Sequence, residues 1–176
     1  MRIVVGVTGA SGSVIAKRLI EELRKNKIDT KVIVSDSAKI TLKEEGVSIK
    51  SDYSERDIAA DLASSSRKID AFVICPCSVK TLGAIAHGYS STLITRLADN
   101  CLKMRRKVIL CVRETPYSLI HIKNMEIVTL AGAIVMPLNI AYYFKPKKIE
   151  DITDFFVGKV FDLLDIEHKL YRRWKE

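Results

Sequence analysis

The sequence predicts an α/β fold in which one doubly wound parallel sheet carries helices on both faces. Five short apolar segments alternate with segments whose apolar residues recur at helical spacing. Such alternation is typical of parallel strands joined by crossover helices, because the helices then cover both faces of the sheet. A chain of 176 residues also fits one compact core, so we expect a single domain over residues 1–176.

The first strand is expected at residues 3–7, an apolar run that ends in the turn 8–12. Apolar residues then recur at helical spacing from Val14 to Leu23 and predict the first helix. The glycine-rich turn therefore joins a strand directly to a helix.

The second strand is expected at residues 30–34. Three good helix N-caps follow it and predict a helix that ends at Gly46; they are Ser35, Asp36 and Ser37. Residues 47–68 are polar and rich in serine, so we expect a loop with one helical turn near residues 58–62. A loop of this length in a compact domain is more often functional than not.

The third strand is expected at residues 71–75, with Pro76 at its end. Ser78 then caps a helix that runs to about His87, and a second helical segment occupies residues 91–103.

The fourth strand is expected at residues 108–112, after which Pro116 opens a helix that Gly132 ends. The last strand is expected at residues 133–136, and an amphipathic helix at residues 149–164 precedes a charged tail. Both of these helices carry many apolar residues.

The chain is basic, with a formal net charge of +8, so its surface attracts anions. Its Lys and Arg residues are spread along the sequence and no RNA-binding aromatic pattern accompanies them. We therefore expect a phosphorylated small ligand and no nucleic acid.

The four cysteines lack the paired spacing of a zinc site, so reduced buried thiols and no metal are expected. No run of about 18 apolar residues is present, which predicts no membrane partner and a cytoplasmic location.

In an open parallel sheet, ligands bind beyond the carboxyl ends of the strands. Gly6, Gly9 and Gly12 match neither the dinucleotide fingerprint nor a P-loop, which disfavours a NAD enzyme and an NTPase. The turn instead offers backbone N–H groups and the hydroxyls of Thr8 and Ser11, which suit an anion or a flavin edge. A strand-to-helix turn that binds nothing remains an alternative.

Two further segments at strand ends carry polar groups. Residues 35–37 offer hydroxyls and N–H groups to a phosphate, although simple helix capping explains them equally well. Arg113 and Glu114 follow a strand directly and suit the binding and protonation of a phosphate. A structural ion pair or a subunit contact is the alternative for that pair.

Several motifs together resemble the UbiX flavin prenyltransferase family over nearly the whole chain. They are residues 7–12 (VTGASG), 75–82 (CPCSVKTL), 96–99 (RLAD), 102–103 (LK), 113–116 (RETP), Tyr143, and the segment from Asp154 to Trp174.

The resemblance implies a flavodoxin- or Rossmann-like sheet that binds reduced FMN and dimethylallyl phosphate. An enzyme of this family joins the dimethylallyl carbon to flavin N5 and then closes a ring onto C6. The product, prenylated FMN, serves a UbiD-type decarboxylase. The family's reaction needs no metal, and neighbouring subunits of a homo-oligomer, a trimer or a dodecamer, complete the site.

The resemblance also implies roles for individual residues, with Glu45 as the proton relay of ring closure and Ser11 beside the reactive flavin edge. The remaining FMN contacts are Gly9, Ala10, Ser35, Ser37, Ser78, Thr81 and Arg96. The prenyl donor is expected to meet Lys103, Arg113, Glu114 and Tyr143, with Glu114 also catalytic.

Two other activities share this fold. A flavin-dependent decarboxylase of cysteine-containing substrates would need an active histidine and a Pro-x-Met-Asn motif, and neither is visible. An FMN carrier that does not prenylate would need the flavin pocket without the Arg113–Glu114 pair. The chain departs from the family pattern at Ser65, where a glycine is usual, and at Ser91 and Thr92.

Overall fold

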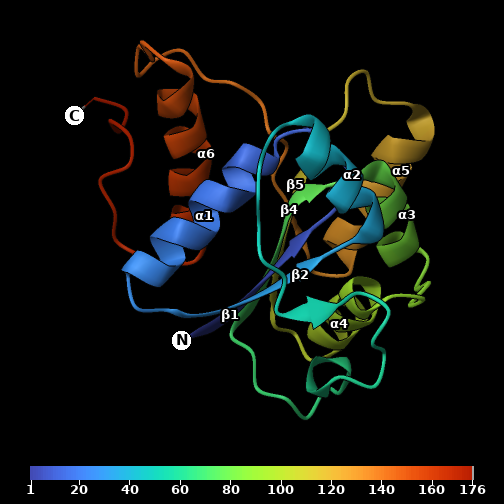
Figure 1. Ribbon diagram of the computed structural model, residues 1–176. Helices are drawn as coiled ribbons and strands as arrows, with labels where there is room; N and C mark the ends of the chain where they lie inside the picture. The colour runs from blue at the N-terminus through green and yellow to red at the C-terminus, as the bar shows by residue number, and fades with distance from the viewer. Residues whose placement is uncertain (176) are drawn as a thin grey trace.

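The computed structural model describes residues 1–175 and shows a parallel sheet between two helical layers (Figure 1). Within these residues the sheet has six strands, all parallel to their neighbours. In spatial order they are β3 (Tyr53–Ser54), β2 (Asp29–Val34), β1 (Arg2–Val7), β4 (Ala71–Cys77), β5 (Lys107–Val112) and β6 (Ile134–Val135). The order reverses at β1 and β4, so their carboxyl ends mark the expected binding edge.

The helices lie on both faces of the sheet, as the sequence predicts. They are α1 (Ser13–Lys25), α2 (Asp36–Glu44), α3 (Val79–Ala86), α4 (Leu93–Lys103), α5 (Leu119–Leu130) and α6 (Ile149–Leu163), with a short 3₁₀ helix, η1, at Asp61–Ala63. Figure 1 shows α1 against α6 on one side of the sheet and α3, α4 and α5 on the other.

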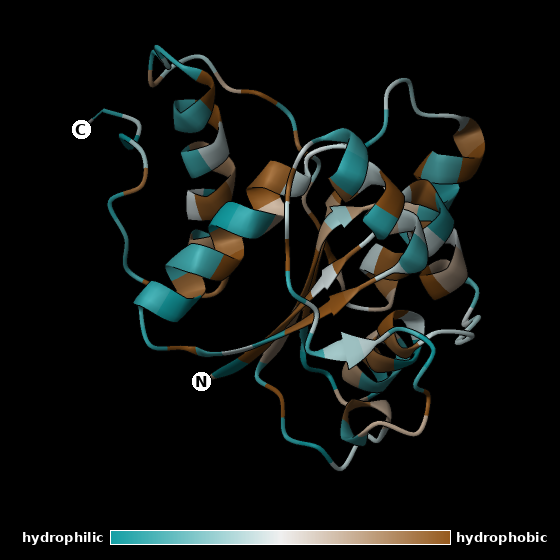
Figure 2. Ribbon diagram, in the orientation of Figure 1, coloured by the Kyte–Doolittle hydropathy of each residue, from teal (hydrophilic) through white to brown (hydrophobic). Residues whose placement is uncertain are grey.

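The buried parts of the central strands are almost entirely apolar because both faces of the sheet are covered. Val5 belongs to the cluster that α1 and α6 cover, whereas its neighbour Val4 belongs to the cluster under α3 and α4. Phe161 of α6 and Phe72 of β4 are fully buried in these two clusters. The central strands are accordingly brown in Figure 2.

The structure confirms the predicted fold class and corrects three local predictions. The loop of residues 47–68 contains a strand, β3, which pairs with β2 but is too short and polar to show a strand pattern. Pro76 does not end β4, which continues to Cys77, because the β4–β5 register shifts there and the Pro76 carbonyl still accepts the Thr8 N–H at 3.2 Å.

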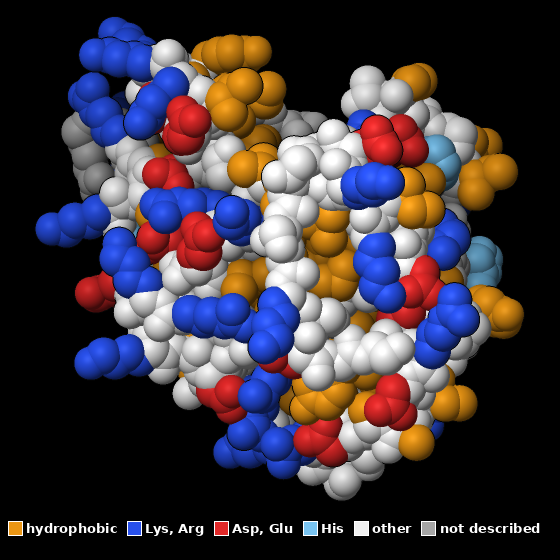
Figure 3. All heavy atoms as spheres, in the orientation of Figure 1, with side chains coloured by type: hydrophobic (Ala, Val, Ile, Leu, Met, Phe, Trp, Pro, Cys, Tyr) orange, Lys and Arg blue, Asp and Glu red, His pale blue; other side chains and the backbone are white. Residues whose placement is uncertain are grey.

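The third correction concerns α5, which begins at Leu119 rather than Pro116. The Ser118 side chain caps it by accepting the backbone N–H of His121 at 3.3 Å. Several of its apolar residues, moreover, do not face the core. Leu119, Ile120 and Leu130 are 69%, 70% and 81% exposed, and apolar spheres accordingly project over α5 at the upper right of Figure 3.

The chain after α6 folds back against that helix and is held by Asp162. The Asp162 carboxylate accepts hydrogen bonds from Tyr171 Oη at 2.5 Å and Arg173 Nη2 at 2.8 Å, and His168 Nε2 lies 2.9 Å away. Gly158 permits this contact, because an added Cβ would lie 2.5 Å from Tyr171 Cδ1. Burial raises the pKa of Asp162, but the hydrogen bonds from Tyr171 and its neighbours outweigh burial and hold the pKa well below its usual range.

We expect Asp162→Asn to destabilise the fold at pH 7 by about 1–3 kcal/mol, because it removes a charged acceptor from the side chains bonded to it, which include Lys159 at 3.3 Å. A depressed carboxyl pKa stabilises the fold above the unfolded-state pKa, near 4, and this stabilisation is lost as the pH falls further. The variant should therefore lose less stability than the wild type between pH 5 and pH 2, as urea unfolding at each pH would measure.

Asp165→Asn is the matched control, because Asp165 is 85% exposed and pairs only at the surface with Lys107. It should change stability by less than about 1 kcal/mol. An Asp162→Asn protein with the wild-type acid dependence would contradict the assignment.

Candidate functional site

Two adjoining pockets open at the carboxyl edge of the sheet and share Ser37 and Lys80. The first, which we call the serine pocket, is lined by Thr8, Ser35, Ser37, Glu55, Lys80, Thr81, Ala84, Tyr89, Ser91, Thr92, Ile94 and Thr95. The second, which we call the arginine pocket, is lined by Gly9, Ala10, Ser37, Ser78, Val79, Lys80, Arg113 and Glu114.

The turn after β1 is packed against the start of α2. A Cβ added to Gly9 would lie 2.6 Å from Ser37 Cβ and 3.2 Å from its backbone carbon, so only glycine allows this approach. The Ser35 N–H donates to the Val7 carbonyl at 2.9 Å. The two turns that the sequence assigns to the flavin therefore form one continuous wall.

Thr8 joins this wall to the end of β4. Its buried hydroxyl donates to the Pro76 carbonyl at 2.8 Å and accepts the Ser78 N–H at 2.8 Å. Ser78 in turn caps α3 by accepting the Thr81 N–H at 3.3 Å. Two predicted contact residues, Ser78 and Thr81, thus depend on one hydroxyl that the sequence offered only as a direct ligand.

Glu45, at the end of α2, reaches the first turn of α1. Its carboxylate accepts the backbone N–H groups of Gly12 at 2.9 Å and Ser13 at 2.8 Å. Burial raises the Glu45 pKa, but hydrogen bonds from Ser13, Ser11 and the two N–H groups outweigh it, so the net pKa is lowered. The carboxylate is thus ionised beside Ser11 and can accept a proton. Glu44 and Glu45 are both exposed, but it is Glu45 that makes the hydrogen bonds to α1.

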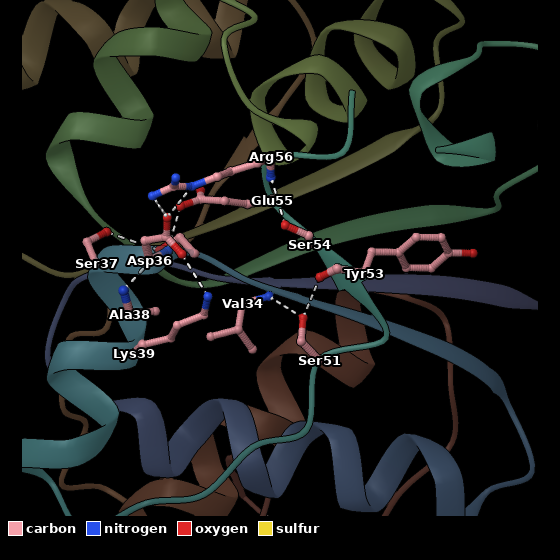
Figure 4. A network of polar contacts seen from close by, with 11 residues as sticks. Val34, Asp36, Ser37, Ala38, Lys39, Ser51, Tyr53, Ser54, Glu55 and Arg56 are labelled. Carbon is pink, nitrogen blue, oxygen red and sulfur yellow. Dashed lines mark hydrogen bonds and ion pairs between the residues drawn. The ribbon is translucent and has the colours of Figure 1, made fainter. Parts of the chain in front are cut away.

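The N-terminus of α2 forms a small network of polar groups (Figure 4). Ser35 Oγ accepts the Ala38 N–H at 3.0 Å and lies 3.0 Å from Ser37 Oγ. The Asp36 N–H donates to Glu55 Oε1 at 2.5 Å. Glu55 was missed by the sequence reasoning, because an acidic residue in a polar loop carries no signal of its own.

Arg113 and Glu114 extend from the end of β5 into the arginine pocket. Among residues 1–175 no ion pair joins them; Glu114 Oε1 instead accepts the Thr115 N–H at 3.0 Å. The structural ion pair that the sequence left open is therefore not formed between these two residues, and the subunit contact stays an alternative. Lys80 adds a cation to both pockets, and the sequence reasoning gave it no role of its own.

The remaining predicted residues lie away from both pockets. Arg96 and Lys103 line a separate pocket beside η1, together with Asn100, and each makes a long ion pair of 3.8 Å with Asp99. Arg96 Nε also donates to the Ala63 carbonyl at 3.4 Å. Tyr143 packs against rings of the C-terminal region, with its ring centroid 5.2 Å from that of Trp174. A single chain therefore does not bring Lys103 and Tyr143 to Arg113 and Glu114.

Two of the departures from the family pattern make hydrogen bonds in this chain, Thr92 through its side chain and Ser65 through its backbone carbonyl. Thr92 is the N-cap of α4 and exchanges hydrogen bonds with Thr95, and both side chains line the serine pocket. The Ser65 carbonyl accepts Arg106 Nη2 at 2.8 Å.

The described residues, 1–175, contain no group of three or more His, Cys, Asp or Glu side chains arranged to hold a metal ion. Burial raises the pKa of the Cys101 thiol to about 11, which keeps this cysteine protonated. None of the helices within these residues has the length and apolar character needed to cross a membrane.

Comparison with known proteins shows which family the chain belongs to. The family described as Flavoprotein matches residues 1–169. The flavin prenyltransferase UbiX of Methanocaldococcus jannaschii is 48% identical, over 99% of this chain and 98% of that protein.

Two solved structures have nearly the same fold. A UbiX protein, AnUbiX, in complex with FMN and dimethylallyl pyrophosphate is 39% identical, with a TM-score of 0.95 over 99% of this chain and 97% of that one. A dodecameric FMN-dependent UbiX-like decarboxylase from Escherichia coli O157:H7 is 35% identical, with a TM-score of 0.94 over 100% of each chain. We conclude that the chain belongs to the flavoprotein family and, within it, to the UbiX flavin prenyltransferases.

Proposed function

We propose that the chain transfers a dimethylallyl group from dimethylallyl phosphate to N5 and C6 of reduced FMN at the two adjoining pockets, and so makes prenylated FMN. The observation that carries the proposal is the arginine pocket, in which Arg113, Glu114 and Lys80 meet the flavin turn at Gly9 and Ala10. The solved relative that carries FMN and dimethylallyl pyrophosphate supports the choice of substrates.

The FMN phosphate fits the serine pocket, where Ser35, Ser37 and Thr81 present hydroxyls at the starts of α2 and α3. Hydroxyls and N–H groups at helix N-termini bind phosphate through both hydrogen bonds and the helix dipole. The flavin ring then extends past Gly9 and Ala10, which line the arginine pocket, toward Ser11. The residues present therefore fit FMN.

Breaking the allylic C–O bond leaves negative charge on the phosphate and positive charge on carbon. Arg113 and Lys80 stabilise the departing phosphate, and Glu114 protonates it, which removes the need for a metal ion. The flavin supplies the electron-rich ring that accepts the allyl group. Glu45, ionised beside Ser11, accepts a proton during ring closure.

A second copy of the chain completes the site in this proposal. Arg96, Lys103 and Tyr143 are remote from Arg113 within one chain, and the exposed apolar residues of α5 need cover from water. We therefore propose a homo-oligomer, a trimer or a dodecamer, as in the dodecameric relative. A UbiD-type decarboxylase is the proposed recipient of the product.

Cysteine decarboxylation is disfavoured by the position of the histidines. His168 is bound to Asp162, and His87 and His121 line neither pocket. An FMN carrier is disfavoured because it would need no cation and acid at Arg113 and Glu114.

Mass spectrometry tests the proposal directly. After anaerobic incubation with reduced FMN and dimethylallyl phosphate, the released flavin should carry the added mass of one five-carbon unit. Dimethylallyl diphosphate, supplied in a parallel incubation, identifies the preferred donor. If the protein binds FMN but releases it unmodified, the proposal is contradicted and the chain is an FMN carrier.

In the same assay Glu114→Gln should slow prenyl transfer by about 10²-fold or more, the usual scale for a lost general acid. Because Gln is nearly isosteric with Glu, folding and FMN binding should persist. Near-normal turnover would assign Glu114 a structural role, and a loss of FMN binding would show that the residue is misplaced.

Light scattering should report a mass that is a multiple of the 19.8 kDa chain. A double variant with Ile120 and Leu130 changed to Lys should shift the protein toward smaller species, because it places charges on the exposed apolar face of α5. Ile40→Lys is the control, since Ile40 is 65% exposed but lies on α2. A fully active monomer would contradict the proposal.

A further inference from the structure

An acidic side chain occupies the N-terminus of α2, next to the hydroxyls proposed to hold the FMN phosphate. Glu55 Oε1 accepts the backbone N–H of Asp36, the first residue of the helix, at 2.5 Å (Figure 4). The Glu55 carbonyl also accepts the Leu93 N–H at 2.7 Å, so its backbone is fixed between α2 and α4.

Glu55 is the carboxylate that faces the serine pocket at this point. Asp36 pairs instead with Lys39 Nζ at 2.7 Å and Arg56 Nη2 at 2.6 Å, and it does not line the pocket. Within residues 1–175 no ion pair neutralises Glu55. An unpaired negative charge therefore lies on the same pocket wall as Ser35 and Ser37.

A carboxylate at a helix N-terminus takes the position that suits a phosphate, because both groups accept N–H bonds and both are favoured by the helix dipole. The Asp36 N–H donates one bond, which Glu55 already takes. A phosphate dianion bound at Ser35 and Ser37 would also repel a carboxylate a few ångströms away. Both anions cannot hold this position together.

We propose that Glu55 is an intramolecular competitor of the flavin phosphate: it occupies the α2 N-terminus and swings toward solvent when phosphate binds. This inference rests on the proposed function, since it concerns the affinity of that site. Glu55 lowers the affinity for phosphorylated flavin, and its return favours release of a product that another enzyme must receive. Glu55 does not change the affinity for a flavin that lacks the phosphate.

Binding of oxidised FMN and of riboflavin, followed by flavin fluorescence, tests the proposal. Glu55→Gln keeps an acceptor for the Asp36 N–H but removes the charge, so the α2 cap should persist and circular dichroism should be unchanged. We expect the dissociation constant of FMN to fall by about tenfold, the difference between a charged and a neutral acceptor. The dissociation constant of riboflavin should stay the same.

Glu44→Gln is the matched control, because Glu44 lies exposed at the other end of α2 and its loss changes the net charge equally. This control should leave both affinities unchanged. An FMN affinity that is unchanged or weaker in Glu55→Gln would overturn the proposal. So would an equal gain for riboflavin, because Glu55 would then act on the ring or the ribityl chain.

Ser37→Asp separates this inference from the proposed function. It places a fixed charge at the phosphate site, so FMN binding should be lost while riboflavin binding persists. Ser37→Ala removes one hydroxyl without adding a charge, so it should weaken FMN binding much less than Ser37→Asp does. If Ser37→Asp binds FMN normally, the phosphate placement itself is wrong. If it expels FMN but Glu55→Gln does not bind FMN more tightly, only the role of Glu55 is overturned.

Discussion

The site depends on the hydrogen bonds of one buried hydroxyl, that of Thr8. By donating to Pro76 and accepting from Ser78, it fixes the turn after β1 to the turn after β4, at the point where the strand order reverses. Parallel strands bring these turns to one edge, but they do not set the distance between them. The Thr8 bonds set that distance, and the close contact of Gly9 with Ser37 extends the same wall to α2.

The N-termini of α1 and α2 at this edge each bind a carboxylate, Glu45 and Glu55 respectively, and the two carboxylates are held differently. Glu45 accepts two N–H groups at the start of α1 and a hydrogen bond from the Ser13 hydroxyl, and these bonds lower its pKa and keep it ionised. Glu55 accepts a single N–H of α2 and borders an open pocket, so an arriving phosphate can displace it. The carboxylate with two backbone hydrogen bonds, Glu45, is therefore expected to stay in place, whereas Glu55, with one such bond, can be displaced by a ligand.

The parallel sheet also explains why the predicted cationic residues lie in two separate places. Arg113 comes directly after β5 and Lys80 lies in the first turn of α3, so both residues reach the binding edge. Arg96 and Lys103 instead lie on α4 beside η1, at another pocket. A parallel sheet presents only one edge of strand ends to a ligand. In the proposed oligomer, cations elsewhere on the surface would reach such a ligand from another copy of the chain, and the exposed apolar face of α5 is the proposed contact.

The sequence by itself determined the strands of the sheet from β1 to β6 apart from β3, and the turns at the binding edge, because buried strands and helix caps leave local patterns. Only the tertiary structure revealed β3, the continuation of β4 past Pro76 and the start of α5 at Leu119, since partners distant in sequence decide these. It also placed Glu45 rather than Glu44 beside Ser11, exposed the role of Thr8, and brought Glu55 to the start of α2. Those contacts join residues far apart along the chain, and a local sequence pattern cannot predict which distant groups come into contact.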